Sequence, residues 1–214
     1  MPKPTPGTPL LPGHGDRRSR IPVYFFVEGE TEEDYVRHLN RLTRRFQFYI
    51  GGRHTDRQEL VDRAIAHLAG ADENTRVWCI FDYDGDDRVD SLLGKARRNG
   101  VHVAFSNPCL ELWWLLHFQA VSGRLDAITI VKKLCDLRET SAFHDLGKQK
   151  KRLTPDRWGA LRARYEKAKA NAEKLVDQCD CPCGPPRHGN NCVPSKRIPS
   201  TNLAELIDSM GITY

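Results

Sequence analysis

The chain reads Arg76-Val77-Trp78-Cys79-Ile80-Phe81-Asp82-Tyr83-Asp84-Gly85-Asp86-Asp87 in the stretch that decides its fold. The apolar run from Val77 to Phe81 has the length and the residue types of a buried β-strand. Four carboxylates follow within six residues, and Gly85 permits a sharp turn among them. Like charges this dense repel one another unless water, a basic partner or a cation compensates. The Asp-x-Asp at the strand tip is therefore a candidate Mg²⁺ site.

Strand and helix patterns alternate before this stretch. Residues 21–27 are β-branched and aromatic and predict a first strand. Thr31 is the predicted N-cap of the helix that follows it. A short strand is predicted over residues 47–50, closed by Gly51-Gly52, and a second amphipathic helix precedes Arg76.

The alternation continues after it, with a short helix over residues 91–98 and an apolar strand over residues 101–105. Asn107 is the predicted N-cap of an apolar helix that has Pro108 at its first position and runs to Phe118. The β-α-β-α-β-α-β-α order over residues 21–118 predicts an α/β fold, a parallel sheet flanked by helices.

Acidic residues follow two of the predicted strands, Glu28 after the first and Asp82 with Asp84 after the third. In open α/β sheets the ligand site lies beyond the carboxyl ends of the strands, so we expect these side chains to converge. Taken singly, each stretch is better explained by an acidic helix start or a solvated loop. Together they favour a site that holds Mg²⁺ against a scissile phosphate.

The C-terminal part is predicted to be helical, with a long helix that starts at Thr154-Pro155-Asp156 and a short one within residues 200–210. Residues 148–174 hold ten Lys and Arg against three acids, a net charge of +7. This basic segment suits a polyanion, although a solvated helix face is an equal alternative. Its candidate nucleic-acid contacts are Lys148, Lys150, Lys151, Arg152, Arg157 and Arg164.

The seven cysteines fall into two groups. Cys79, Cys109 and Cys135 lie in apolar contexts and are expected to be buried thiols. A second group could form a tetrahedral Zn²⁺ site, although its Cys-x-Cys-x-Cys spacing departs from the usual one and a flexible loop over residues 179–192 is the alternative. Its members are Cys179, Cys181, Cys183, His188 and Cys192.

The N-terminal residues 1–20 are rich in proline, glycine and basic residues and are expected to be a disordered tail. Without an apolar signal region or a membrane-spanning run, the chain is expected to be soluble, cytoplasmic and without a membrane partner. Two domains are expected, an α/β core over residues 21–120 and a helical extension over residues 121–214.

Two polar residues stand out in the apolar helix. Glu111 is expected to point at a partner near the helix start, because burial of an unpaired carboxylate is costly. A histidine in such a helix is more often packed and hydrogen-bonded than catalytic, so His117 is expected to be structural.

The strands that end in Glu28-Gly29 and in Asp82-Tyr83-Asp84 resemble the TOPRIM pattern of topoisomerases, bacterial primases and OLD-type nucleases. More specifically, residues 27–32, residues 78–84 and the string from Ser106 to Phe118 resemble the RloB-like family, which is linked to bacterial restriction and abortive-infection loci. The resemblance covers residues 22–118.

This resemblance implies an RNA- or DNA-cleaving effector of anti-phage defence that uses Mg²⁺ or Mn²⁺ and often works with an ATPase partner. Glu28 would be the general acid/base or a metal ligand, Asp82 and Asp84 metal ligands, and Asp86 an outer member of the site. Asn107, Glu111 and His117 would be supporting residues, since they belong to the family string.

Two other functions stay open. One is a phosphatase with an aspartate nucleophile, which is disfavoured because the Asp-x-Asp lies on a later strand and Gly85 stands where a small polar residue is expected. The other is a non-catalytic nucleic-acid-binding or partner-docking module. The sequence does not choose between RNA and DNA, and it does not define the oligomeric state.

Overall fold

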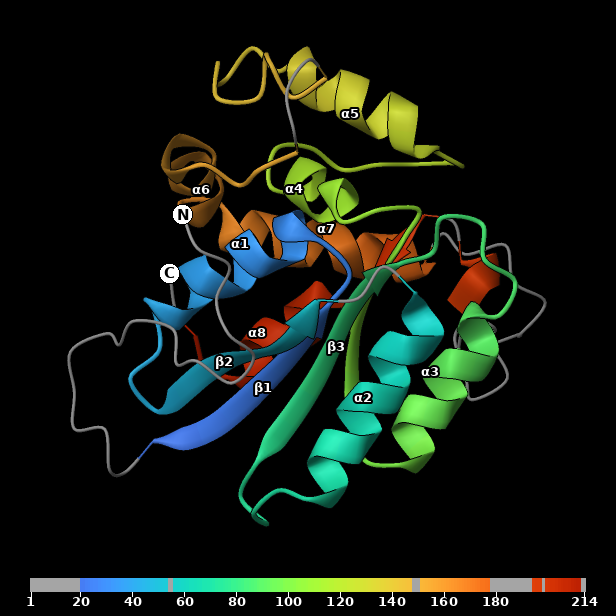
Figure 1. Cartoon of the computed structure of the whole chain (residues 1–214). Helices are drawn as coiled ribbons and strands as arrows, with labels where there is room; N and C mark the ends of the chain where they lie inside the picture. Colours follow the sequence, from blue (N-terminus) through green and yellow to red (C-terminus); the bar gives the residue numbers. More distant parts are fainter. Residues whose placement is uncertain (1–19, 54–55, 148–150, 178–193, 198, 213–214) are drawn as a thin grey trace. The chain divides into compact units, whose positions relative to one another are not determined.

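Five strands pair into one sheet in the order β2-β1-β3-β4-β5 (Figure 1). The strands are β1 (Ile21–Val27), β2 (Phe46–Arg53), β3 (Arg76–Asp82), β4 (His102–Asn107) and β5 (Ser200–Thr201). β1 runs parallel to β2 and β3, whereas β5 runs antiparallel to β4. The predicted α/β fold with a mostly parallel sheet is therefore confirmed.

This computed structural model describes residues 20–53, 56–147, 151–177, 194–197 and 199–212. Residues 1–19 of the predicted N-terminal tail, Lys148, Lys150 and the whole Cys-rich loop lie outside these residues. The chain divides into two compact units, the first made of residues 1–81, 91–104 and 205–213 and the second of residues 82–90 and 105–204.

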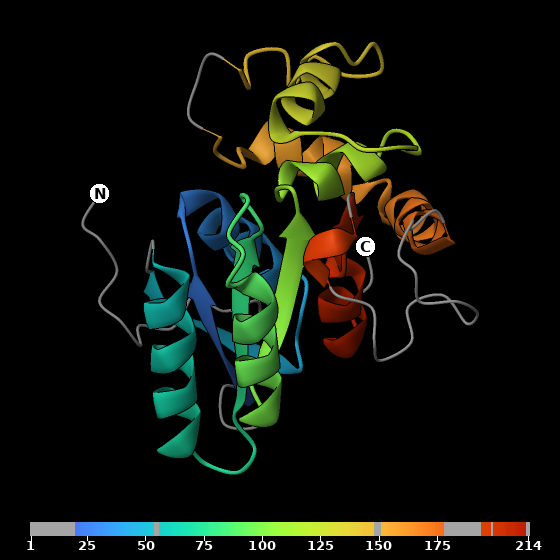
Figure 2. The same ribbon diagram turned by 90° about the vertical axis from the view of Figure 1, so that its right-hand side faces the viewer.

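In the first unit, helices cover both faces of the sheet. α2 (Arg57–Ala69) and α3 (Val89–Arg98) lie on one face, and α1 (Glu30–Asn40) and α8 (Leu203–Ser209) lie on the other (Figure 2). This arrangement follows from right-handed crossovers, because the step from β1 to β2 and the step from β2 to β3 run in opposite directions across the sheet.

A glycine allows β1 and β2 to approach closely. The two residues Gly51-Gly52 lie within β2, where a strand end was predicted. A Cβ at Gly51 would come 2.6 Å from the ring of Phe26 on β1, next to a register shift between Phe25 and Phe26. The prediction of a strand end was wrong because the glycine makes room for an aromatic ring.

The start of α1 also differs from its prediction. The helix begins at Glu30 with Gly29 as N-cap, so Thr31 is not the cap. The backbone N–H of Gly29 donates to Oε2 of Glu32 at 2.8 Å. An acidic side chain from the first turn therefore satisfies the N-terminal backbone in place of the threonine hydroxyl.

The second unit contains the remaining helices, α4 (Glu111–Leu116), α5 (Ala127–Cys135), α6 (Pro155–Arg162) and α7 (Tyr165–Asp177). α4 packs against α5 and α7, and all its residues are buried. The predicted start at Thr154 is confirmed, since its Oγ1 accepts from the N–H of Arg157 at 3.3 Å. The single long helix was wrong, because α6 ends at Arg162 and α7 begins at Tyr165.

Asn107 is the last residue of β4 and not a helix N-cap, which corrects the prediction. It pairs with Ser200 on β5, and its Nδ2 donates to the carbonyl of Ser195 at 3.0 Å. A C-terminal strand that the sequence pattern did not predict thus extends β4, and α4 begins only at Glu111.

Candidate functional site

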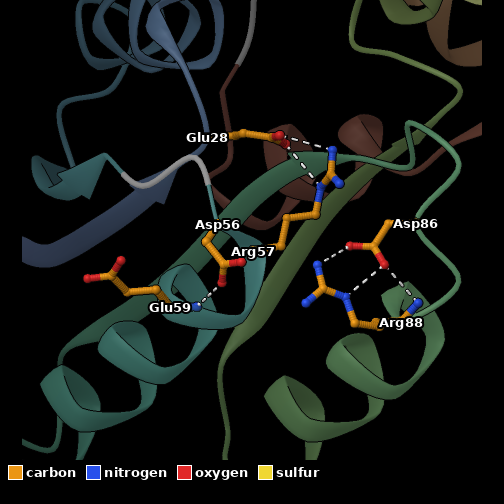
Figure 3. Close-up of polar contacts among 6 residues, drawn as sticks. All are labelled: Glu28, Asp56, Arg57, Glu59, Asp86 and Arg88. Carbon is orange, nitrogen blue, oxygen red and sulfur yellow. Dashed lines mark hydrogen bonds and ion pairs between the residues drawn. The ribbon is translucent and has the colours of Figure 1, made fainter.

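Glu28 follows β1 directly and lies opposite the end of β3. Its backbone N–H donates to the carbonyl of Ile80 at 3.3 Å, which continues the pairing of the two strands. Its carboxylate accepts two hydrogen bonds from Arg57, one to Oε1 from Nη2 at 2.9 Å and one to Oε2 from Nε at 3.3 Å (Figure 3). The side chains are 22% and 11% exposed, so this bidentate pair is partly desolvated.

The structure of α2 explains the position of Arg57. Asp56 is the N-cap of the helix, and its Oδ1 accepts from the N–H of Glu59 at 2.9 Å (Figure 3). Arg57 is therefore the first helical residue. Arg57 was not among the predicted site residues, because it lies 29 residues from Glu28 and no local pattern relates the two.

Basic side chains also compensate the other acids after β1. Arg53, the last residue of β2, has Nη1 3.4 Å from Oε1 of Glu30 and 3.7 Å from Oε2 of Glu33. Glu33 pairs in addition with Arg37 at 2.6 Å, one turn further along α1. The start of this helix is thus a network of ion pairs, with acids where they suit the helix dipole.

The Asp-x-Asp lies at a tight turn in the second unit. Asp84 and Gly85 have φ angles of 43° and 78°, and the N–H of Asp86 donates to the carbonyl of Tyr83 at 2.9 Å. Two central residues with positive φ define a type I′ turn, for which Asp-Gly is a favoured pair. The expected sharp turn is present, and it leaves the Asp84 side chain exposed.

Two backbone hydrogen bonds attach this turn to the end of β4 and to the segment that follows it. The N–H of Tyr83 donates to the carbonyl of Ser106 at 2.9 Å, and the N–H of Asp84 donates to the carbonyl of Pro108 at 3.5 Å. The backbone of the Asp-x-Asp is therefore held next to the start of the family string that contains Glu111.

Asp86 interacts with Arg88. Its Oδ1 accepts from the backbone N–H and from Nε of Arg88 at 2.9 and 3.0 Å, and its Oδ2 accepts from Nη2 at 2.9 Å (Figure 3). This local ion pair compensates one of the four acids, and Asp86 would have to exchange it to take part in metal binding.

Glu111 is buried and its ion-pair partner is Lys151. Its side chain is 3% exposed, and Oε2 lies 3.3 Å from Nζ of Lys151, whose side chain is 45% exposed. The expected partner exists, but it comes from the linker before α6 and not from the helix start. Burial lowers the pKa of Lys151, but the negative charges of Glu111 and Asp82 outweigh it, and the pKa lies above its usual value.

His117 is a packed histidine. It is 1% exposed, its Nδ1 lies 2.8 Å from the carbonyl oxygen of Trp113, and its ring meets the Trp113 ring edge-on. Burial lowers the pKa of His117 to about 4. A neutral, sealed imidazole fits the structural expectation and not a proton-transfer role.

The predicted nucleic-acid contacts divide by burial. Arg157 is 2% exposed and donates to the carbonyls of Ala142 and Arg152 and to Asp145, so its assignment as a phosphate contact was wrong. Arg164 is partly buried, donates to the carbonyl of Ala160 at 2.8 Å and lies over the ring of Phe118. Among the described candidates, the exposed side chains are those of Lys151 and Arg152.

The donor chemistry after β1 and β3 suits a hard divalent cation, since it consists of carboxylate oxygens. Within the described residues, however, no group of three or more His, Cys, Asp and Glu side chains is already arranged to hold a metal. Cys79 and Cys109 are buried as expected, whereas Cys135 is partly exposed. Burial raises the pKa of both buried thiols, which makes them poor metal ligands.

An open, mostly parallel sheet with acidic residues directly at the ends of β1 and β3 places the chain among the α/β-sheet proteins with a candidate site at the carboxyl ends of strands. Within that class it belongs to the RloB-like family, whose model matches residues 23–210. Neither a curated protein nor a solved structure matches the chain. In the part of the chain that the structure describes, no helix is both long and apolar enough for a membrane crossing.

Proposed function

We propose that this RloB-like protein is a divalent-metal-dependent nuclease with a TOPRIM-like core, which hydrolyses phosphodiester bonds of RNA or DNA in bacterial anti-phage defence. The observation that carries the proposal is the position of the acids. Glu28 follows β1 and Asp82 ends β3, and these strands are parallel neighbours in the sheet. Acidic residues at adjacent carboxyl ends are what metal-assisted phosphate chemistry requires.

The residues have separate roles in this proposal. Asp82 and Asp84 hold the cation through carboxylate oxygens, and Asp84 is suited to this because the type I′ turn exposes it. The cation, Mg²⁺ or Mn²⁺, supplies charge stabilisation at the phosphate when it is bound. Glu28 handles the proton, and Arg57 orients its carboxylate through the bidentate pair. Asp86 has an outer role beside Arg88.

One observation favours a non-catalytic alternative. Glu28 and Asp86 are both engaged by arginines, as acids with a purely structural role would be. In that case the chain would be a nucleic-acid-binding or partner-docking module, and the basic residues of the second unit would contact phosphates without cleavage.

Incubation of the protein with tRNA, single-stranded DNA and duplex DNA tests the proposal, with Mg²⁺, Mn²⁺ or EDTA in parallel. We expect metal-dependent cleavage of at least one substrate, and its loss in Asp82→Asn. Binding without cleavage under every metal condition would instead support the docking module. Acyl-phosphate trapping on Asp82 would identify the phosphatase.

Two further parts of the proposal are an ATPase partner, which the family resemblance implies, and a cytoplasmic location, which the sequence pattern predicts. Phage challenge of cells that carry the gene with and without its neighbours, followed by affinity purification, tests the partner, and cell fractionation tests the location. Elemental analysis of the purified protein tests for zinc as a second metal.

A further inference from the structure

The Glu111–Lys151 ion pair is asymmetric. The carboxylate is sealed, with 3% of its side chain exposed, whereas 45% of the Lys151 side chain remains in contact with solvent. A buried carboxylate is costly without a partner, so Lys151 stabilises the fold by pairing with Glu111. The exposed part of the Lys151 side chain leaves room for an anionic ligand.

The pair also lies close to the Asp-x-Asp turn. The backbone N–H of Asp84 donates to the carbonyl of Pro108, three residues before Glu111. The charge of Asp82 acts on Lys151 and on Cys109, and Cys109, two residues before Glu111, is hydrogen-bonded to the Glu111 side chain. The ammonium group therefore lies in the field of the acids proposed to hold the metal.

A buried arginine holds the backbone next to Lys151. Arg157 donates from Nη1 to the carbonyl of Arg152 at 2.6 Å and from Nε to the carbonyl of Ala142 at 3.0 Å. Its Nη2 donates to Asp145 at 2.6 Å. The guanidinium thus joins Ala142 and Asp145, in the middle of the segment between α5 and α6, to Arg152 near its end, and fixes the backbone next to Lys151.

From this geometry we propose that Lys151 is a catalytic residue of the nuclease, whose ammonium contacts a non-bridging oxygen of the nucleic-acid phosphate at the Asp-x-Asp turn. Glu111 is its positioning residue. The inference rests on the proposed function and deepens it, because it names the group that recognises the phosphodiester. A fixed cation at this place stabilises the negative charge that develops on the phosphate.

The test separates this role from a structural one through a double variant. Loss of Lys151 alone leaves Glu111 buried without its charged partner, which is strongly destabilising and can unfold the protein. The double variant Glu111→Gln, Lys151→Met replaces the pair with neutral side chains of similar size. Lys151→Arg keeps the charge, and Lys167→Met removes an exposed lysine of α7 as the matched control.

We expect the double variant to keep the wild-type melting temperature within a few degrees and to lose about 10²–10³-fold in kcat. Lys151→Arg should retain part of the activity, and Lys167→Met should retain all of it. A folded double variant with wild-type kcat would overturn the proposal.

A binding measurement tests the contact without cleavage. The affinity for a fluorescent single-stranded oligonucleotide is measured in EDTA at several salt concentrations, and loss of one phosphate contact lowers the slope of log K against log salt by about 0.7. If the wild type cleaves no substrate with any metal, the proposed nuclease function is wrong. The salt dependence still shows in that case whether Lys151 contacts a phosphate. An unchanged slope in the double variant, or no binding by the wild type, overturns the phosphate contact.

Discussion

Arg57 donates two hydrogen bonds to the carboxylate of Glu28, from Nη2 to Oε1 at 2.9 Å and from Nε to Oε2 at 3.3 Å. The two side chains come from the start of α2 and the end of β1, and both are largely shielded from solvent. A planar guanidinium fixes the plane of a carboxylate, which a lysine ammonium does not do. The proposed proton-handling residue is thus oriented before any substrate binds.

Arg57→Met should lower the free energy of unfolding by about 1–3 kcal/mol, because Glu28 stays partly buried without its charged partner. It should also reduce cleavage, and Arg57→Lys should give an intermediate rate. Urea unfolding and a cleavage assay measure the two effects.

Arg63→Ala is the matched control for this prediction. Arg63 lies on the same helix and pairs with Glu59 at 3.0 Å, but the two side chains are 61% and 50% exposed. Its loss should change stability by no more than about 0.5 kcal/mol. Equal effects of the Arg57 and Arg63 variants would show that the Glu28 pair has no special role.

Asp84→Asn should separate the fold of the turn from its chemistry. Asparagine tolerates the left-handed region as aspartate does, so stability should stay within about 0.5 kcal/mol of the wild type. Metal-dependent cleavage should fall by about 10²-fold or more, because a carboxylate ligand is lost. Asp87→Asn is the control, because Asp87 is an exposed neighbour in the same loop, and this variant should cleave at the wild-type rate. Cleavage by Asp84→Asn at the wild-type rate would exclude Asp84 as a metal ligand.

The order of strands and helices was predictable because each pattern is local. The apolar run before Asp82 and the helical spacing before Arg76 need no information from the rest of the chain. The end of β4 was not predictable in this way. Ser106 and Asn107 extend the strand because they pair with Thr201 and Ser200. The hydroxyl oxygens of Ser106 and Thr201 are 3.0 Å apart, although the two residues are separated by 95 positions in the sequence.

The candidate site follows the same division. Glu28, Asp82 and Asp84 are visible in the sequence because each stands directly at a strand end. The ion pairs of Glu28 with Arg57 and of Glu111 with Lys151 are not, because ion pairs between distant segments depend on tertiary packing. Lys151 itself was predicted, but only as a basic phosphate contact. The assignment of Arg157 as a phosphate contact failed for a related reason. A basic sequence pattern does not distinguish an exposed guanidinium from one that is buried and hydrogen-bonded to backbone carbonyls.

Gly51→Ala should destabilise the contact between β1 and β2. The added Cβ would lie 2.6 Å from two atoms of the Phe26 ring, which is 3% exposed and has little room to move. Overpacking of this kind costs about 1–3 kcal/mol, measurable by chemical denaturation. Gly159→Ala in α6 is the control, because nothing lies within 4 Å of its Cβ and a helical alanine should add about 0.5–1 kcal/mol. Destabilisation by both variants would argue against the close approach at Phe26.

The stability of the protein should depend on pH through His117. Burial lowers its pKa to about 4 in the folded protein, from the usual histidine value of 6.5. As pH falls below 6.5, the unfolded chain therefore takes up the proton first, so the contribution of the neutral histidine is present above that pH and is lost towards pH 4. The loss is at most about 3.5 kcal/mol, since each pKa unit corresponds to about 1.4 kcal/mol.

His117→Asn isolates this contribution, because asparagine does not titrate and its amide can still donate to the carbonyl of Trp113. Urea unfolding at several pH values should give a flatter pH dependence for the variant than for the wild type between pH 6.5 and 4. His67 and His102, whose pKa values burial also lowers, titrate in both proteins and cancel in the difference. Parallel curves for the two proteins would mean that His117 becomes protonated without loss of the fold, and a sealed, neutral imidazole at the C-terminal end of α4 would then be excluded.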